Sequence, residues 1–318
     1  MKNHVDTVFQ TVQSGSAPAV SRIAASWRRS MDKHGLHPGE GHGPERIGDS
    51  QLRQRLDRTG ALSRIAAPKL DQLFGLVGQS GCTVLLTDAE GVILDQRCGP
   101  ADETVFREWG LSTGTDWSEA AVGTNGVGTC VAEERPIIVH QNEHFLARNA
   151  GMSCMDAPIF GPDGRLAGAL DVSSARSDQT EAFNRLIAAM VAQMARQIEA
   201  EAFRAAFARD RIVCAGTDAS DTTMLLAVDC NDIVVGATRG ARKAFGLGIA
   251  GPLSPRPATD LLGRNDEAGG LRTAERAAVV RALTRAGGNV SEAARALGVG
   301  RATLYRRMKR LGIGEKTS

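Results

Sequence analysis

The 318-residue sequence contains no apolar run that approaches the roughly 20 residues of a membrane-spanning helix. Residues 1–16 also lack the basic start and apolar core of a signal peptide. These two absences predict a protein that stays in the cytoplasm and does not enter a membrane. The hydrophobic fraction of 42% and the charged fraction of 23% are ordinary for folded protein, which argues against wholesale disorder.

The cysteines lack the spacing of a metal site. None of the six forms a Cys-x-x-Cys pair, and widely spaced cysteines in the cytoplasm are expected to be reduced. His140 and His144 are four residues apart, but Val139 indicates that His140 ends a strand, so we expect polar roles for both and no metal or cofactor. The Gly-x-Gly-x-x-Gly pattern at 246–251 follows a helix-like stretch and does not predict a dinucleotide site.

The net charge of +2 hides an uneven distribution. Residues 271–318 contain eleven Lys or Arg and three acidic residues, a net charge of +8, whereas the remainder has 27 basic and 33 acidic residues, a net charge of −6. A small basic end on an acidic body is typical of a nucleic-acid-binding module joined to another domain. A solvated basic tail is the alternative, but a tail would not have the apolar pattern that this segment shows.

The basic segment predicts a helix-turn-helix domain over 271–318. Thr273 and Ser291 are the expected N-caps of the first two helices, and Gly298 supplies the tight turn before the third. A short helix, a turn with glycine and a second helix form the signature of this motif. The predicted helices span 273–286, 292–297 and 301–311.

The third predicted helix has the composition of a recognition helix. Side chains near the start of such a helix reach base edges, where Arg pairs well with guanine, while Ser291 and the later basic residues would hold phosphates. A three-helix protein-interaction module is the alternative, and the cationic exposed face disfavours it. The expected DNA-binding residues are Ser291, Arg301, Ala302, Thr303, Tyr305, Arg306, Arg307 and Lys309.

This segment resembles the Fis-type domain at the end of enhancer-binding regulators. The resemblance runs through Asn-Val-Ser-Glu-Ala-Ala-Arg-Ala-Leu-Gly-Val at 289–299 and Arg-Ala-Thr-Leu-Tyr-Arg-Arg at 301–307. Gly300 departs from the family, which often has a Ser cap there, but Gly is a tolerable N-cap. The resemblance implies sequence-specific binding to a double-stranded DNA operator.

The N-terminal two thirds predict an α+β fold. Residues 1–70 are expected to form a helical region, with an amphipathic helix from Val20 to His34 and a second helical stretch at 52–77 that breaks at Pro68. From Cys82 the pattern changes to short apolar runs separated by turns, which indicates strands beside short helices and a sheet with a covered face. The predicted strands span 83–88, 92–94, 136–139, 157–160 and 166–172.

Residues from about 20 to 200 resemble the sensor of acetoin-catabolism regulators. The resemblance rests on Ser-Trp-Arg-Arg-Ser at 26–30, Gly-Thr-Asn-Gly-Val-Gly-Thr at 123–129 and Met-Ser-Cys at 152–154. It implies a GAF-like domain over 71–200 that binds a small-molecule effector beside its sheet. Each candidate residue taken alone is better explained as core or as part of a turn. The candidates are Trp109, Trp117, Asn125, Thr129, His144, Cys154 and Met155.

The connection to the basic end is expected to begin with one long helix over 178–209. Its apolar stripe would pack on its own domain or pair with a second copy, and a homodimer is expected because one helix-turn-helix covers only a half-site. Residues 201–250 are expected to hold the helix end and a small PAS-like segment from Thr223 to Leu247, with a turn at 231–232. Residues 251–270 read as a linker.

The family resemblance also implies a central ATPase domain, but the sequence has no Gly-x-x-x-x-Gly-Lys-Ser/Thr motif. We therefore expect a regulator that recruits or blocks RNA polymerase, or assists a full-length regulator. Its target genes, by analogy, would serve small alcohol, diol or ketone catabolism. Two alternatives remain open: a GAF-type reductase or redox sensor that uses Cys82, Cys130 or Cys154, and a nucleoid-structuring protein.

Overall fold

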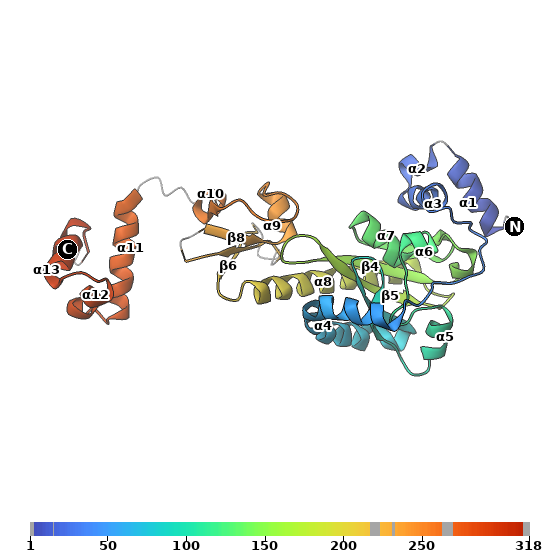
Figure 1. The fold of residues 1–318 in the computed structure, drawn as a ribbon, viewed down its shortest axis with the longest axis horizontal. Helices are drawn as coiled ribbons and strands as arrows, with labels where there is room; N and C mark the ends of the chain where they lie inside the picture. The colour runs from blue at the N-terminus through green and yellow to red at the C-terminus, as the bar shows by residue number, and fades with distance from the viewer. Residues whose placement is uncertain (1–2, 15, 217–222, 231–232, 263–269, 314–318) are drawn as a thin grey trace. The chain divides into compact units, whose positions relative to one another are not determined.

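The computed structural model describes residues 3–14, 16–216, 223–230, 233–262 and 270–313 (Figure 1). The chain divides into two compact units, Met1–Pro255 and Arg256–Ser318. The division lies within 251–270, the stretch expected to be a linker, of which 263–269 are outside the described residues. No described helix is long and apolar enough to cross a membrane.

The first unit begins with helices. The helix predicted from Val20 to His34 forms as α3 and begins at Arg22, because Ser21 is extended and its hydroxyl accepts the amide hydrogen of Ala24 at 3.3 Å. This cap starts α3, and α1 before it was not predicted from the sequence. The helices are α1 (His4–Gln13), α2 (Ala17–Val20), α3 (Arg22–Asp32) and α4 (Asp49–Val77).

The predicted break at Pro68 is wrong, because α4 continues through this residue. Proline removes one helical hydrogen bond and crowds the preceding turn. Ala66, Leu70 and Leu73 flank Pro68 and are fully buried in the core beneath the helix. We attribute the continuity of α4 to this packing, which holds both halves of the helix on the same sheet.

A sheet of five antiparallel strands forms the centre of this unit, in the order β2-β1-β5-β4-β3. The two predicted hairpins are confirmed: β1 pairs with β2, and β4 pairs with β5. The strand β4 begins four residues before the predicted one. The strands are β1 (Cys82–Asp88), β2 (Ile93–Arg97), β3 (Ile137–His140), β4 (Ser153–Phe160) and β5 (Leu166–Ser174).

Both faces of the sheet are covered (Figure 1). Helices α4 and α8 cover one face over a core that includes Leu70, Val172 and Ile198. On the other face lie shorter helices and the N-terminal helices, around a core that includes Trp27 and Phe145. The elements of this second face are α5 (Glu103–Glu108), α6 (Glu119–Val122), α7 (Gly126–Glu133) and the 3-10 helices at Gln141–Glu143 and Ala147–Asn149. A further 3-10 turn, Gly78–Ser80, follows α4.

The predicted long helix is confirmed as α8 (Glu181–Ala206), which begins at a Thr180 cap. Its apolar stripe packs on its own domain: Ile187, Val191 and Ile198 are buried against the sheet. Phe203, near the end of α8, is buried instead against β7 of a second, smaller antiparallel ladder.

The second ladder contains β6 (Arg211–Cys214), β7 (Leu225–Val228) and β8 (Ile233–Ala237), followed by α9 (Arg239–Ala244). The sequence predicts the two apolar runs and the short helix but not β6. The turn predicted at 231–232 lies outside the described residues.

The second unit contains the short elements β9 (Arg256–Pro257) and α10 (Ala258–Leu262), then α11 (Gly270–Arg285), α12 (Val290–Ala296) and α13 (Arg301–Arg310). The three predicted helices are thus present, although α11 begins before Thr273, which is therefore not its cap. Val279 is buried, whereas its neighbour Val280 is 37% exposed. Val279 joins Ala293, Ala294 and Leu304 in a core that sets α13 on the other two helices.

Candidate functional site

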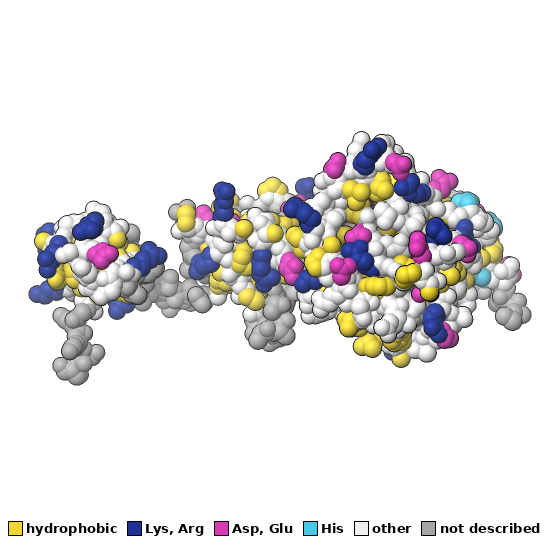
Figure 2. Space-filling model, turned by 90° about the horizontal axis from the view of Figure 1, so that it is seen from below, with side chains coloured by type: hydrophobic (Ala, Val, Ile, Leu, Met, Phe, Trp, Pro, Cys, Tyr) yellow, Lys and Arg dark blue, Asp and Glu magenta, His cyan; other side chains and the backbone are white. Residues whose placement is uncertain are grey.

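The exposed face of α13 carries most of the predicted DNA-binding residues. Leu304 is buried beneath the helix, and this contact turns the opposite face to solvent. Thr303 and Arg307 are half-buried, and the Arg301 guanidinium lies over the Tyr305 ring at 5.6 Å. In Figure 2 the charged side chains visible on this unit are mostly basic. The exposed predicted residues are Ser291, Arg301, Ala302, Tyr305, Arg306 and Lys309.

An acidic residue that the sequence analysis did not select contacts the far end of this helix. Glu275 on α11 pairs with Arg307 at 3.4 Å and also with Arg310. The carboxylate therefore neutralises part of the cationic face at the end of α13, whereas no described ion pair involves Arg301 or Arg306. Arg301, Arg306 and Lys309 therefore have no acidic partner among the described residues, and Arg301 lies at the start of the helix, the part that reaches base edges in helix-turn-helix proteins.

The caps of the motif differ in part from those predicted. Asn289, and not Ser291, caps α12, because the Asn289 side chain accepts the amide hydrogens of Ser291 and Glu292 at 3.0 and 3.3 Å. Ser291 lies in the first turn with its side chain exposed. Gly300 is the extended residue that precedes α13, and it leaves the first amides of α13 without a side-chain cap.

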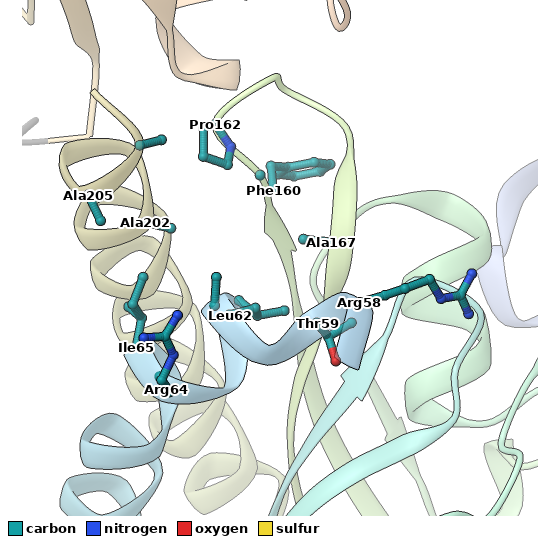
Figure 3. Close-up of a pocket in the computed structure, with 13 residues that line it drawn as sticks. Arg58, Thr59, Leu62, Arg64, Ile65, Phe160, Pro162, Ala167, Ala202 and Ala205 are labelled. Carbon is teal, nitrogen blue, oxygen red and sulfur yellow. The ribbon is translucent and has the colours of Figure 1, made fainter. Parts of the chain in front are cut away.

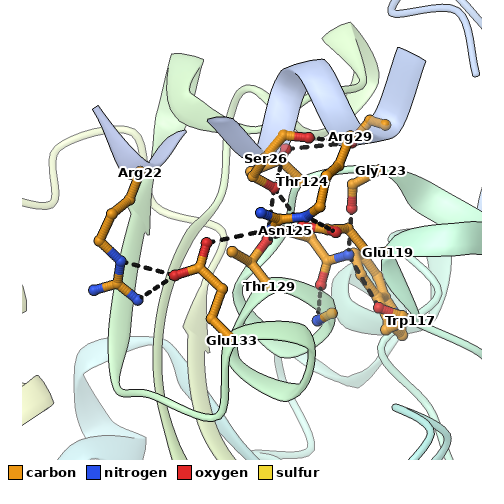
Figure 4. Close-up of polar contacts among 12 residues, drawn as sticks. Arg22, Ser26, Arg29, Trp117, Glu119, Gly123, Thr124, Asn125, Thr129 and Glu133 are labelled. Atoms are coloured by element: carbon orange, nitrogen blue, oxygen red, sulfur yellow. Dashed lines mark hydrogen bonds and ion pairs between the residues drawn. The ribbon is translucent and has the colours of Figure 1, made fainter. Parts of the chain in front are cut away.

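A buried polar network fastens α3 to the short helices on the second face of the sheet (Figure 4). Arg29 donates two hydrogen bonds of 2.8 Å to Glu119, whose side chain is only 5% exposed. Ser26 donates to the same carboxylate, and so does Thr129, at 3.2 Å. Hydrogen bonding to Glu119 raises the pKa of Arg29. The network therefore holds the N-terminal helices firmly over α6 and α7.

Three of the predicted effector-binding residues are used by the fold itself. Trp117 donates to the Gly110 carbonyl at 2.9 Å, and Thr129 belongs to the Glu119 network. The Asn125 side chain caps α7 by accepting the Gly128 amide hydrogen at 2.8 Å, and it donates to the Trp117 carbonyl at 3.0 Å. Trp109, half-buried, packs against the same core.

The other three predicted effector-binding residues do not share one side of the sheet. Cys154 belongs to the core on the α7 side, whereas Met155 belongs to the core beneath α4 and α8, because successive side chains of a strand alternate. His144 lies with Cys154: its Nε2 is 3.4 Å from the Cys154 Sγ, and its Nδ1 is 2.9 Å from the Gln141 carbonyl. Complete burial lowers the pKa of His144 to about 4, so the ring is neutral.

Two buried carboxyl groups lie beside Cys154 on the same face. Asp156 of β4 and Asp171 of β5 are directly opposite each other in the ladder. Burial raises the pKa of Asp171 to about 7, and burial together with the neighbouring Asp171 charge raises the pKa of Asp156 well above its usual range. The Ser173 hydroxyl donates to Asp171 at 2.8 Å, and its oxygen lies 3.1 Å from the Cys154 Sγ. Acceptor-rich, desolvated groups of this kind are typical of functional sites.

The Asp156 carboxyl has no hydrogen-bond donor from another described side chain or amide. The two carboxyl groups satisfy each other when they share one proton, with Asp156 as donor and Asp171 as acceptor, which agrees with the more strongly raised pKa of Asp156. Gly126 at the start of α7 lies against this pair, since a Cβ there would be 2.5 Å from the Cys154 Cβ. Neither aspartate was predicted from the sequence, although an acid within an apolar strand is a visible signal.

Three thiols are buried, and His140 has hydrogen-bonding neighbours on the sheet and on α8. Burial raises the pKa of Cys82, and raises it further for Cys130 and Cys154. His140 Nδ1 is 2.7 Å from the Ser153 hydroxyl and 3.0 Å from the Asn184 amide nitrogen, on the α8 side of the sheet. Among the described residues, no group of three or more His, Cys, Asp or Glu side chains is arranged to hold a metal ion.

Two family profiles match the chain. The profile described as MimR, N-terminal domain, matches residues 7–200, and that of the Fis family of bacterial regulatory proteins matches residues 270–311. The first of these covers more than half of the chain, and the second covers α11 to α13.

Curated relatives share the same two regions. The acetoin catabolism regulatory protein of Cupriavidus necator is 34% identical over 84% of this chain and 41% of its own length. The MimR activator of the propane 2-monooxygenase operon of Mycolicibacterium smegmatis is 30% identical over 48% of this chain and 25% of its own length. The chain therefore spans less than half the length of these relatives.

A solved structure has a similar fold. A chain of the DhaR(N)–DhaL complex of E. coli matches 75% of this chain and 80% of its own length, with a TM-score of 0.52 and 16% identity. At this identity the match concerns the fold alone, a mixed α/β arrangement built on an antiparallel sheet.

Proposed function

Because the chain belongs to the family defined by the MimR N-terminal domain, we propose that it is a transcription regulator that binds DNA and responds to a small molecule. The Fis-type match and the names of the relatives as regulators support the first half of this proposal. The observation that carries it is the exposed face of α13, where Arg301 and Arg306 have no acidic partner among the described residues.

Recognition of DNA follows from the chemistry of these side chains. Arg301 and Arg306 would reach base edges in the major groove, with Thr303 and Tyr305 between them, while Ser291, Arg307 and Lys309 would contact phosphates. Ala302 is exposed and small enough to permit close approach to a thymine methyl group. A homodimer would place two such helices on the half-sites of a two-fold operator.

The sensor is proposed to be a GAF-like domain that binds its effector on the α7 side of the sheet. The hydrogen-bonding groups of His144 and Cys154, together with Asp156 and Asp171, would recognise a polar ligand there. Trp117, Asn125 and Thr129 would respond indirectly, because they hold α6 and α7 in place. Entry of a ligand would displace α7, since the packing around Gly126 leaves no space for it.

The relatives suggest the genes that are regulated. By analogy with regulators of acetoin catabolism and of a propane monooxygenase operon, the targets would serve catabolism of small oxygenated or alkane-derived metabolites. RNA polymerase or another regulator of the same family would be the protein partner. The raised pKa of the buried thiols disfavours the reductase alternative, since the thiolate is the reactive form.

The test begins with genome-wide mapping of the sites bound by the chain, which yields an operator. Its Kd is then measured for the unchanged chain, for Arg301→Ala and for Arg306→Ala. We expect each variant to lose about tenfold in affinity, within the range for loss of one base contact. Arg185→Ala, at an exposed ion pair on α8, removes the same charge from the sensor and should retain the original Kd. Unchanged operator affinity in both α13 variants would refute the proposal.

A further inference from the structure

We propose that the first unit has a second small-molecule site, between α4 and α8, that takes an apolar ligand with one negative charge. The site is a hollow of about 650 Å³ bounded by α4, the end of α8 and the turn between β4 and β5 (Figure 3). This volume lies within the roughly 300–1,000 Å³ of small-ligand sites. The hollow is lined by different residues from the His144 and Asp156 cluster, which lies beneath α7 on the other face of the sheet.

The walls of the hollow are mostly apolar, and short side chains of α8 near its end leave space beside the middle of α4. The alanines of α8 provide one wall, Leu62 and Ile65 of α4 provide the second, and Phe160 with Pro162 provides the third (Figure 3). Buried apolar surface of this kind favours an alkyl chain or an aromatic ring over a sugar or a nucleotide. The alanines are Ala202, Ala205 and Ala206.

The charges at the hollow are of one sign. Arg58 and Arg64 belong to its lining, which contains no Asp or Glu. Neither arginine takes part in an ion pair within the described residues, and the Arg64 guanidinium donates to the Gly60 carbonyl of its own helix at 3.2 Å. In Figure 3 the Arg58 side chain extends to one side, while Arg64 lies beside Ile65, so we assign the ligand's anionic group to Arg64.

The nearby acids do not neutralise this charge. Glu201 is paired with Lys69 at 2.7 Å. Glu199 accepts the Phe160 amide hydrogen at 2.8 Å, and burial raises its pKa to about 7, so it is only partly ionised at neutral pH. An uncompensated guanidinium beside an apolar cavity matches an amphiphilic anion, such as a carboxylate with a short alkyl chain.

Phe160, in one wall of the site, is also held in place by a contact from α9. The Arg239 guanidinium of α9 lies 4.1 Å from the Phe160 ring centroid, and Arg239 also pairs with Glu134. Phe160 is therefore fixed by contacts at its amide and its ring, which favours a preformed site over one created by binding. Only the Phe160 side chain would separate a ligand that contacts it from Arg239 of α9.

The proposal is tested on the full chain by isothermal titration calorimetry with octanoate, octanol and octylammonium. We expect octanoate to bind most tightly and octylammonium most weakly. Arg64→Gln should weaken octanoate binding about twofold to fivefold, as for an exposed ion pair, and leave octanol binding unchanged. Arg53→Gln, an exposed arginine of the same helix outside the lining, should bind octanoate as the unchanged chain does.

A second pair of variants tests the location. Ala202→Leu fills the hollow and should abolish octanoate binding, whereas Ala189→Leu, at an exposed alanine of α8 outside the lining, should not. Thermal melting confirms that the variants are folded. No octanoate binding to the unchanged chain, or equal binding to Ala202→Leu, would overturn the proposal. Self-association that Ala202→Leu removes would assign the hollow to a second copy of the chain and would also overturn it.

Discussion

Asp156 and Asp171 face each other across the β4–β5 ladder, both buried, beneath the first turn of α7. The pair retains at least one proton at neutral pH, since burial raises the pKa of Asp171 to about 7 and that of Asp156 further. Two carboxyl groups buried inside a sheet cost stability, because both lose their hydration and their short side chains add little apolar packing. They lie beside Cys154 and His144, so four buried polar side chains are gathered at this point of the sheet.

This pair predicts a pH dependence of stability. The pKa of Asp171 is higher in the folded chain, about 7, than its ordinary value of 3.8, so the folded state retains a proton that the unfolded state releases. Stability from this group is therefore present below about pH 4 and is lost as the pH rises to 7. Asp171→Asn should raise the free energy of unfolding at pH 8 by an amount on the order of 2 kcal/mol, measured by urea denaturation.

Comparing the unfolding free energies of Asp171→Asn and of the unchanged chain at each pH isolates the contribution of Asp171 to stability. His144 acts in the opposite direction, because its lowered pKa of about 4 makes stability rise with pH up to the ordinary value of 6.5, but this contribution is common to both chains. Parallel unfolding free energies of the variant and the unchanged chain from pH 4 to 8 would contradict the shared proton.

The close packing around Gly126 allows a steric test of the same site. A Cβ at this position would overlap Asp156 and lie 2.5 Å from the Cys154 Cβ, so Gly126→Ala should lower the free energy of unfolding by about 2–3 kcal/mol. Gly75→Ala is the matched control, because a Cβ there meets nothing within 4 Å in an exposed part of α4, and it should stabilise the chain by about 0.5–1 kcal/mol. Equal effects in urea denaturation would contradict close packing of α7.

The pairing of Glu119 with Arg29 is expected to stabilise the attachment of the N-terminal helices. Glu119→Gln leaves Arg29 without its buried partner and should lower the free energy of unfolding by about 2 kcal/mol, a value reduced because Arg29 is 32% exposed. Amide hydrogen exchange in α3 should accelerate at the same time. Glu103→Gln, which removes an exposed pair with Arg107, should change stability by less than about 0.5 kcal/mol and leave α3 exchange unaltered.

Glu275 is expected to affect how well the chain discriminates its operator from unrelated DNA. Glu275→Gln releases Arg307 and Arg310, so affinity for an unrelated duplex should rise about twofold to fivefold, with a smaller gain for the operator. The ratio of the two Kd values, measured by fluorescence anisotropy at fixed salt, should therefore fall. Glu292→Gln makes the same change of net charge at an exposed residue with no described ion pair. An identical response from both variants would mean that the position of Glu275 is unimportant.

The local sequence was sufficient to predict most elements, because hydrophobic period and capping residues act over a few positions. The stripe of α8, the β4–β5 hairpin and the three helices around Gly298 were all predicted before any contact was known. Prediction failed at Pro68, where packing of distant residues on the sheet overrides the local tendency of proline to end a helix.

Local patterns in the sequence are enough to predict a cationic helix after a glycine turn near residue 300 and short strands before a long helix. Tertiary structure alone decided which side chains meet: it placed Cys154 and Met155 on opposite faces, paired Glu275 with Arg307, and brought Asp156 against Asp171. The reason is physical. Periodicity is a property of neighbouring residues, whereas burial and charge pairing depend on the register between strands and helices far apart in the chain.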